Sequence, residues 1–352
     1  MKAFHQHIRR FAASLIGIVF LISGILKLWD PVGTGLIVTE YGKLVGIGLT
    51  LSLAKGMGMA LSITECLLGI GLITGVLRKL VAIATCCLLG FFTIITLLLW
   101  IYNPSMSCGC FGEAYHLTHA QSFWKNVVLL ALAAIAFIPF KDYGKPRAHR
   151  VVTAVLAVAV LCLGAVRSGM HLQMVDFTEY NWGARLFASL DENASEDDFR
   201  KAAMLSFSSE DGEYADDLAA AGKVLVFSVY DLESAPWEKL LAQYREAEAT
   251  EVLPLVILAS YAGDPALEKL PADIPLYFAD YKTLITLNRS NGGGTYFYDG
   301  EIVHKWASAD FPEDIASFVA EDPVALSSHY VTRRRLLAQA FCVIMAAIFV
   351  LV

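Results

Sequence analysis

Charged side chains are scarce in this sequence. They make up 17% of its 352 residues, whereas soluble chains carry about 25%, and 56% of the residues are hydrophobic. This composition excludes an ordinary soluble globular protein and predicts that much of the chain lies in a lipid bilayer. A clustered basic face is also missing from the sequence, so we expect no nucleic-acid partner.

The charges that are present fall into two populations of opposite sign. Residues 171–330 contain 10 Lys and Arg and 29 Asp and Glu, which leaves 17 basic and 5 acidic residues for the rest of the chain. The formal net charge of −7 therefore averages an acidic, water-soluble stretch and a basic, apolar remainder. This division predicts one extramembrane domain attached to a membrane-embedded part.

Six apolar runs are candidates to cross a bilayer, which takes about 20 residues in a helix. They cover residues 11–26, 57–77, 80–101, 123–140, 151–166 and 336–352. No small-x-small cleavage site directly follows the first run, so we interpret it as a retained span and not as a signal peptide. The predicted α-helical polytopic arrangement has a membrane bundle of four spans at 1–145, a fifth transmembrane helix at 146–170 and a C-terminal transmembrane helix at 332–352.

Basic residues in short loops predict the orientation of the spans, because such residues accumulate on the cytoplasmic side. The N-terminal arm, the hinge at 78–79 and the loop at 141–150 are basic and lie on one side of the predicted topology. The loops at 30–56 and 102–122 then face outward, as does the acidic domain. The three arginines at 333–335 lie on the outer side in this topology, against the charge rule, although long translocated domains weaken that rule.

The pattern of residues 222–328 is typical of alternating strands and helices. Strands are predicted at 223–230, 252–260, 276–279, 295–298 and 301–306, and helices at 234–248, 282–288 and 312–321. Without the short edge strand at 276–279 the order is βαβαββα, and this order with a terminal hairpin and helix favours an α/β thioredoxin-like sheet over a doubly wound one. Residues 171–221 have weaker patterning, and we interpret them as a collar or linker.

Cysteine is absent from residues 171–330. A redox-active thioredoxin fold carries C-x-x-C after its first central strand, at the N-terminus of a helix whose dipole lowers the pKa of the thiol. Residues 231–235 occupy that place and have the sequence DLESA, and the segment 290–295, where the fold normally has a cis-proline, contains no proline. The domain is therefore degenerate in this sense and cannot perform dithiol chemistry itself.

The strongest local motif is Cys108-Gly109-Cys110, between the third and fourth predicted spans on the predicted outer face. Thiols on that face meet an oxidising compartment. Two cysteines separated by one glycine can close a small, strained disulfide, and strained exposed disulfides tend to be the labile or catalytic ones. We interpret Cys108 and Cys110 as a candidate redox pair, with a tight structural turn as the alternative.

His116 and His119 follow this motif and complete the pattern C-x-C-x5-H-x2-H. Cysteine and histidine are ligand types that suit zinc or copper. The spacing is irregular for a zinc finger, so a metal site formed by these two histidines with Cys108 and Cys110 is the weaker alternative, and we expect no metal. No pattern for nucleotide, haem or flavin binding is present, so we expect no cofactor either.

Glu65 lies within the second predicted span, where an ionised carboxylate costs about 2.5–3.5 kcal/mol on insertion scales. Its side chain should therefore face the interior of the bundle. Lys27 and Lys55 are its candidate partners. Two roles stay open for this candidate intramembrane polar site, a contact for a proton or polar substrate and a structural interhelical hydrogen bond.

Three motifs resemble one membrane family. The segments GIVFLISGILKLWDP, TECLLGIGLITG and CGCFG, the last followed by Trp124-Lys125-Asn126, resemble DoxX-like membrane proteins and specifically the methylamine-utilisation MauE branch. The resemblance covers about residues 8–140. It implies a four-helix membrane bundle and an association with the maturation of periplasmic enzymes or with disulfide formation in them.

Two further segments resemble extended bacterial versions of this family. They are VDFTEYNWG at 175–183 and LITLNRSNGGGTYFYDGEIVHKW at 284–306. In those versions a fifth span leads into a degenerate thioredoxin-like domain. The resemblance implies a bacterial inner (cytoplasmic) membrane protein whose acidic domain lies on the periplasmic side.

Together these features predict an integral membrane protein that assists thiol–disulfide exchange or the maturation of exported proteins. Cys108 and Cys110 would be the reactive pair of a thiol–disulfide oxidoreductase component, and the thiol-free domain would be a docking module. The expected partners are the lipid bilayer and an exported client or periplasmic redox protein. The alternatives are a noncatalytic scaffold or binding protein of an envelope complex and, more weakly, a small-solute transporter that uses Glu65.

Overall fold

Five helices in the described part of the chain are long and apolar enough to cross a membrane. The structure is a computed structural model that describes residues 2–138, 146–190, 194–312 and 314–350. The five helices are α1 (Lys2–Trp29), α3 (Leu51–Thr74), α4 (Arg78–Tyr102), α5 (His119–Phe137) and α6 (Ala148–Met170). Each overlaps one of the first five predicted runs, and the end of the fourth run at 139–140 lies outside the described residues. The chain is a multi-pass membrane protein.

The sixth predicted run falls in α11 (Pro323–Val350), which is not among these five helices. Arg333, Arg334 and Arg335 lie inside α11, and the last two residues of the run lie outside the described residues. The apolar stretch that follows the arginines is therefore short for a span within the described chain. A sixth span stays a prediction.

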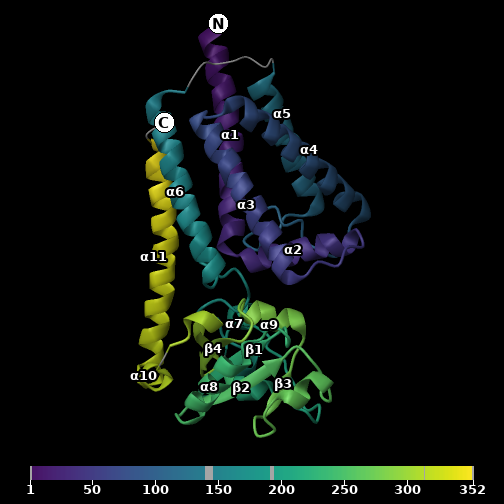
Figure 1. Cartoon of the computed structure of the whole chain (residues 1–352), viewed down its shortest axis with the longest axis vertical. Coiled ribbons are helices and arrows are strands. Elements are labelled where there is room, and N and C mark those ends of the chain that lie inside the picture. The colour runs from purple at the N-terminus through teal and green to yellow at the C-terminus, as the bar shows by residue number, and fades with distance from the viewer. Residues whose placement is uncertain (1, 139–145, 191–193, 313, 351–352) are drawn as a thin grey trace. The chain divides into compact units, whose positions relative to one another are not determined.

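The chain divides into two compact units, which we name the membrane unit and the sheet unit. The membrane unit comprises Met1–Met174 and Ala338–Val352, and the sheet unit comprises Val175–Leu337. Most of their helices and strands are labelled in Figure 1. Each unit has buried hydrophobic clusters of its own.

Glycine residues let α1 and α3 pack closely in the membrane unit. A Cβ atom on Gly24 would lie 2.5 Å from Cys66 Sγ, and one on Gly69 would lie 2.7 Å from the carbonyl oxygen of Gly17. No real Cβ tolerates such distances, so glycine at these positions allows the two backbones to approach. The two helices contribute side chains to both buried clusters of the membrane unit.

The other helices join this pair in two groups. α4 and α5 share one buried cluster with α1 and α3, whereas α6 and the part of α11 that belongs to the membrane unit share the other. α2 (Pro31–Leu44) lies across the bundle and not along it (Figure 1). It begins at Asp30, whose Oδ1 accepts a hydrogen bond of 2.9 Å from the backbone N–H of Gly33, and the proline at its first position fits a helix start. Assignment of these helices to a DoxX-like four-helix bundle stays a prediction.

The sheet unit contains one mixed five-stranded sheet. Its strands are β1 (Lys223–Val229), β2 (Leu253–Leu258), β3 (Leu276–Phe278), β4 (Gly293–Tyr298) and β5 (Glu301–Trp306), in the order β3-β2-β1-β4-β5. β1, β2 and β3 are parallel, and β4 and β5 pair antiparallel. Asp299 and Gly300 join β4 to β5 with positive φ angles, which a two-residue hairpin turn favours. The five strands overlap those predicted, and the thioredoxin-like assignment stays a prediction.

Alternate residues of β1 face two separate clusters, as the period of a strand requires. Leu225, Phe227 and Val229 pack with α8 (Trp237–Glu248) and α10 (Ile315–Ala320). Val224 and Val226 face the other cluster, which includes α9 (Tyr281–Leu287).

Residues 175–221, predicted as part of a collar or linker, add several side chains to the second of these clusters. They are Tyr180, Leu186, Ala203, Leu205, Phe207 and Ala219. Most of the segment is irregular, with short helical pieces such as α7 (Glu196–Lys201) and isolated bridges from Arg185 to Glu301 and from Ser208 to Phe278. Irregular backbone has no hydrophobic period, so the sequence pattern there was weak although the segment is packed.

Lys305 and Asp176 form a fully buried ion pair in the sheet unit. Lys305 Nζ lies 2.8 Å from Asp176 Oδ2, and neither side chain is exposed to solvent. Two cations lie near the ring of Trp182, Lys305 Nζ at 5.7 Å and the guanidinium carbon of Arg334 at 4.0 Å from its centroid. The pair ties the start of the sheet unit to β5.

Candidate functional site

The loop between α4 and α5, residues 103–118, carries the two candidate cysteines, and we name it the thiol loop. Two side chains from other helices hold its backbone. The Tyr41 hydroxyl of α2 donates to the carbonyl oxygen of Cys108 at 2.8 Å, and the Ser23 hydroxyl of α1 lies 2.6 Å from the carbonyl oxygen of Cys110. The pKa of Tyr41 is raised by burial and by the two neighbouring thiols, so this hydroxyl stays protonated and available as a donor. The thiol loop is thus fixed against α1 and α2.

Only glycine fits between the two cysteines. Gly109 has a φ of +64°, in the left-handed region that other residues avoid. A Cβ atom at this position would also lie 2.6 Å from Cγ2 of Ile37. Backbone conformation and close packing on α2 therefore both require the central residue of the Cys-Gly-Cys motif to be glycine.

The two thiols are free and differ in their surroundings. Cys108 is buried, and its Sγ lies 2.8 Å from the Ser122 hydroxyl oxygen of α5. Cys110 is partly exposed. The hydrogen bond from Cys108 and the positive charge of Lys125 lower the pKa of the Cys110 thiol to about 5, although burial acts in the opposite direction. The same hydrogen bond and burial raise the pKa of Cys108. The pair therefore combines one thiolate with one protonated thiol at neutral pH.

A buried ion pair lies directly beside the thiol loop. Lys27 Nζ of α1 is 2.6 Å from Glu65 Oε1 of α3, and both side chains are almost fully buried. The Ser23 hydroxyl lies 2.9 Å from Glu65 Oε2 as well as within reach of the Cys110 carbonyl, and it has a single proton to donate to one of them at a time. Ser23 thus connects the ion pair to the thiol loop.

Lys27 is the structural partner of Glu65, and Lys55 is not. Lys55 Nζ lies instead 3.5 Å from the carbonyl oxygen of Gly169, at the end of α6. A buried carboxylate within a span needs such a compensating cation, because the ion pair and the Ser23 hydroxyl offset part of the cost of removing its charge from water.

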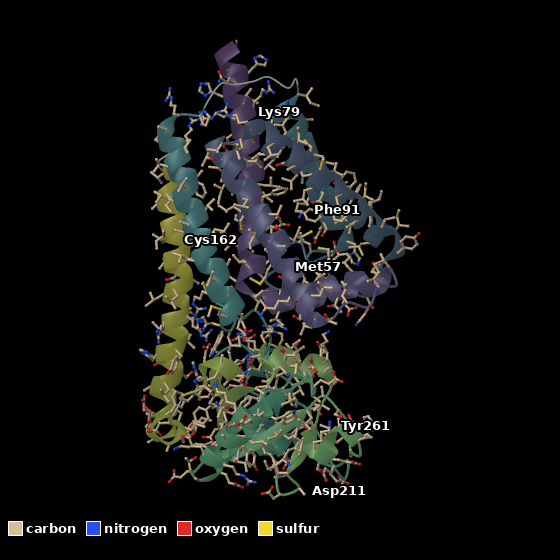
Figure 2. The ribbon with its side chains drawn as sticks, viewed as in Figure 1. Met57, Lys79, Phe91, Cys162, Asp211 and Tyr261 are labelled. Carbon is tan, nitrogen blue, oxygen red and sulfur yellow. The ribbon has the colours of Figure 1, made fainter. Side chains whose placement is uncertain are left out.

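A cavity of about 610 Å³ adjoins these groups. Ser23, Lys27, Glu65, Cys108 and Cys110 are all part of its lining. Most of its other lining side chains are apolar, including two that Figure 2 labels, Met57 on α3 and Phe91 on α4, and Lys125 and Asn126 of α5 line it as well. The cavity therefore brings thiols, an ion pair and an apolar wall together inside the membrane unit.

A comparison with protein families places the thiol site in context. Residues 6–139 match the family model of the methylamine utilisation protein MauE. The comparisons with curated proteins and with solved structures gave no match. The matched MauE region includes α1 to α5, the thiol loop and the Lys27–Glu65 pair, whereas α6 and the sheet unit lie outside it.

His116 and His119 have neighbours other than the two cysteines. Nε2 of His119 lies 3.1 Å from the carbonyl oxygen of Pro104, and Nε2 of His116 lies 3.8 Å from Glu113 Oε2. Within the described residues, no group of three or more His, Cys, Asp or Glu side chains is arranged to hold a metal ion. The structure gives no support to the four-ligand alternative.

The other five cysteines lie in helices away from the thiol loop. Cys66 is buried in α3, whereas Cys86, Cys87, Cys162 and Cys342 are exposed on the surfaces of α4, α6 and α11. Figure 2 labels Cys162 on α6.

The segment of the sheet unit that follows β1 is closed by hydrogen bonds. Asn291 Oδ1 accepts from the backbone N–H of Tyr230 at 2.9 Å and of Asp231 at 3.1 Å, and its Nδ2 donates to the carbonyl oxygen of Asp231 at 2.7 Å. This is the place where sequence analysis found no C-x-x-C motif. The side-chain amide of Asn291, in the loop before β4, occupies this place.

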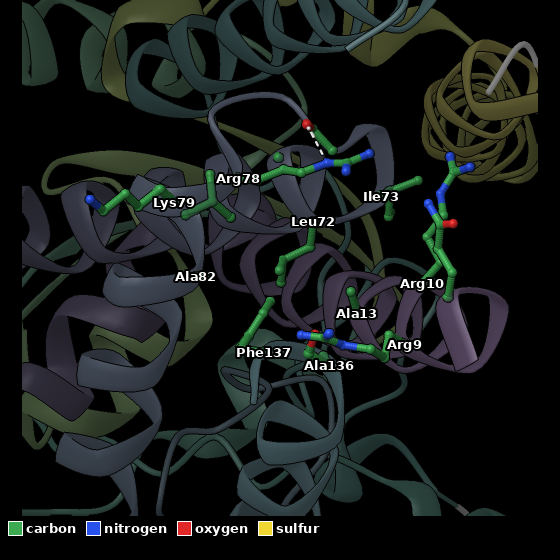
Figure 3. A pocket seen from close by; sticks show the side chains of 14 residues that line it. Arg9, Arg10, Ala13, Leu72, Ile73, Arg78, Lys79, Ala82, Ala136 and Phe137 are labelled. Atoms are coloured by element: carbon green, nitrogen blue, oxygen red, sulfur yellow. Dashed lines mark hydrogen bonds between the residues drawn. The ribbon is translucent and has the colours of Figure 1, made fainter. Parts of the chain in front are cut away.

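A second cavity, of about 290 Å³, lies at the start of α1 beside the α3–α4 turn and the end of α5 (Figure 3). Its lining is basic and includes Arg9, Arg10, Arg78 and Lys79. Two of these arginines bind carbonyl oxygens at helix ends, Arg9 Nε that of Ala136 at 3.0 Å and Arg78 Nε that of Gly75 at 3.1 Å. This basic end contains residues that the topology prediction assigns to the cytoplasmic side, and that orientation stays a prediction.

The sequence indicated both cysteines, Glu65 and its partner Lys27, but gave no role to Ser23, Tyr41, Ser122 or Lys125 at this site. Ser23 precedes Lys27 by four residues and so shares its helix face, a signal that was available. Tyr41, Ser122 and Lys125 had no such signal, because their roles depend on how the thiol loop folds back onto α2 and α5.

Proposed function

We propose that this membrane protein assists the maturation of exported proteins by thiol–disulfide exchange, with Cys108 and Cys110 as the reactive pair. The observation that carries the proposal is the opposite perturbation of two adjacent free thiols. A thiolate beside a protonated thiol is the arrangement that exchange requires. The match of residues 6–139 to a methylamine utilisation family is compatible with an accessory role in maturing enzymes of that metabolism.

The low pKa of Cys110 also indicates a direction for the exchange. A stabilised thiolate favours the reduced form of a pair and makes the corresponding disulfide a stronger oxidant. In the forward reaction two client thiols would reduce a Cys108–Cys110 disulfide. One disulfide then forms in the client, and the S–S bond of the pair breaks. One client proton passes to Cys108, the other is released to water, and Cys110 remains as a thiolate beside the Lys125 ammonium.

The sheet unit would act as a docking module in this proposal. It contains no cysteine, and Asn291 closes the segment where a thioredoxin-like domain would carry its thiols. Its acidic composition leaves a charged surface for a client. Client binding and thiol chemistry would thus be assigned to different units.

A single-turnover exchange assay tests the proposal. The full-length protein is oxidised in lipid nanodiscs and mixed with a reduced dithiol peptide, and protein and peptide thiols are then alkylated and weighed. We expect one peptide disulfide for each protein chain and two new thiols confined to Cys108 and Cys110. Cys110→Ser should abolish the reaction, whereas Cys162→Ser, a substitution at an exposed cysteine of α6, should leave it unchanged. A pair that never changes its redox state would rule out the proposal.

The closed, thiol-free sheet unit favours one alternative, a noncatalytic scaffold that binds an envelope partner. This alternative predicts that Cys108→Ser combined with Cys110→Ser leaves client maturation intact, whereas deletion of residues 171–330 abolishes it. The exchange proposal predicts that both changes abolish maturation.

A further inference from the structure

The 610 Å³ cavity of the membrane unit opens between helices that are candidate membrane spans. Its lining includes exposed apolar side chains from the end of α2 and from α3 and α4, among them Val45, Met57, Phe91 and Leu98. An exposed apolar rim on spanning helices faces lipid acyl chains, not water. Molecules dissolved in the bilayer can therefore enter this cavity, and polar solutes are disfavoured.

Part of the cavity lining is polar. Cys108 and Cys110 reach it from the thiol loop, and Lys27 and Glu65 reach it from α1 and α3. Lys27 Nζ also lies 5.7 Å from the centroid of the Phe92 ring, which lines the cavity from α4. A volume of this size is within the range of about 300–1,000 Å³ that small-molecule sites occupy. The cavity suits a lipid-soluble molecule with a flat polar head group.

The proposed exchange leaves the thiol pair reduced after each client. Reoxidation requires an acceptor for two electrons. The described residues hold no metal-binding cluster, and the remaining cysteines do not line this cavity. A lipid acyl chain fits the apolar wall but accepts neither electrons nor hydrogen bonds. A lipid-soluble electron acceptor with a polar redox-active ring can enter past the apolar rim and can also accept the two electrons.

We propose that the cavity binds a lipid-soluble quinone that reoxidises Cys108 and Cys110, an inference that rests on the proposed exchange function. Cys108 loses its S–H proton, and one S–S bond forms between Cys108 and the Cys110 thiolate. Two electrons pass to the quinone with that proton and a second proton from water, and the quinone leaves as the hydroquinone. Lys27 holds a ring oxygen by a hydrogen bond, and the apolar wall holds the ring and its tail.

The test uses the full-length protein in nanodiscs without native quinone, reduced and kept free of oxygen. A short-tailed ubiquinone analogue is added, and hydroquinone absorbance and the mass of alkylated protein are followed together. We expect saturable formation of one hydroquinone for each Cys108–Cys110 disulfide. A reaction that does not saturate, or one that proceeds equally after Cys108→Ser combined with Cys110→Ser, would overturn the inference.

Two matched tryptophan variants of α3 locate the reaction. Leu61→Trp places an indole in the cavity wall, whereas Leu67→Trp places it on an exposed position that does not line the cavity. We expect the first to raise the KM for the quinone about tenfold or more, the equivalent of about 1.4 kcal/mol, and the second to leave it unchanged. Equal KM values for both variants would refute binding in this cavity.

The peptide exchange assay tests the thiol–disulfide exchange function separately from quinone binding. It also reports whether each variant is folded. A Leu61→Trp protein that still oxidises one peptide per chain is intact, so its raised KM reports quinone binding. Normal peptide exchange without any reoxidation by quinone overturns the inference alone. Failure of the unmodified protein to exchange with the peptide overturns the exchange function itself.

Discussion

The pH dependence of Cys110 reactivity follows from its surroundings and can be worked out in advance. Its pKa is about 5, because the Cys108 thiol and the Lys125 ammonium both stabilise the thiolate. At pH 5 half of Cys110 is ionised, whereas an ordinary cysteine of pKa about 8.5 is only about 0.03% ionised. Cys110 therefore carries about 1,600 times more thiolate at that pH.

A thiol of lower pKa gives a less nucleophilic thiolate. With a Brønsted coefficient of about 0.4–0.5, the lower pKa reduces intrinsic reactivity toward a disulfide about 40-fold. The two effects nearly cancel at pH 7, where an ordinary cysteine is about 3% ionised. At pH 5 Cys110 should still react about 40 times faster than an ordinary thiol. The pH profile, and not the rate at pH 7, is therefore the informative measurement.

The assay is reaction of the reduced protein with a small aromatic disulfide between pH 4 and pH 9, with peptide mass spectrometry to assign the modified thiol. We expect a midpoint near pH 5 for Cys110. Lys125→Met should move the midpoint upward, because it removes a positive charge near the thiolate, and Lys125→Arg should leave it nearly in place. A midpoint at or above pH 8 in the unmodified protein, or equal midpoints in the two lysine variants, would refute the reasoning.

Three further predictions concern stability. Lys27→Met leaves the Glu65 carboxylate buried without its cation and should lower the free energy of unfolding of the purified protein by about 3–5 kcal/mol in thermal unfolding. A second substitution, Glu65→Leu, should restore most of the lost stability. Asp176→Ala should cost a similar amount, seen as faster hydrogen exchange across β5, and the combination of Asp176→Leu with Lys305→Met should lose much less. Tyr41→Phe leaves a carbonyl of the thiol loop without its donor, at a cost of about 1–3 kcal/mol, so maleimide should label the loop cysteines faster. Unchanged labelling would show that this hydroxyl does not hold the loop.

The membrane spans and the five strands were the parts of the fold that the sequence could predict. A run of about 20 apolar residues has one physical interpretation in a chain with so few charges, so each of the five candidate helices overlaps a predicted run. The exact ends of the helices were harder to predict. The second run was extended to residue 77, but Gly75 adopts a φ of +73° and ends α3 at Thr74.

Contacts between segments that are far apart in the sequence could not be predicted from it. Lys27 and Lys55 were equally suitable partners for Glu65 until the packing of α1 on α3 selected Lys27. The low pKa of Cys110 depends on Lys125, which a helix start brings back toward the thiol loop. The core role of Tyr180 and its neighbours was hidden because irregular segments bury side chains without a repeating pattern.

The Lys27–Glu65 pair also constrains how the chain can be assembled in a membrane. The Glu65 carboxylate alone would cost α3 about 2.5–3.5 kcal/mol during insertion. Lys27, in the last turn of α1, is separated from it in the chain by α2 and its following turn. Neutralisation is available only when α1 and α3 meet. The first span should therefore stay at the lateral gate of the insertion channel until the third helix emerges, and the two should enter lipid as a couple. Insertion of α1 and α3 into the membrane would then depend on formation of the Lys27–Glu65 ion pair.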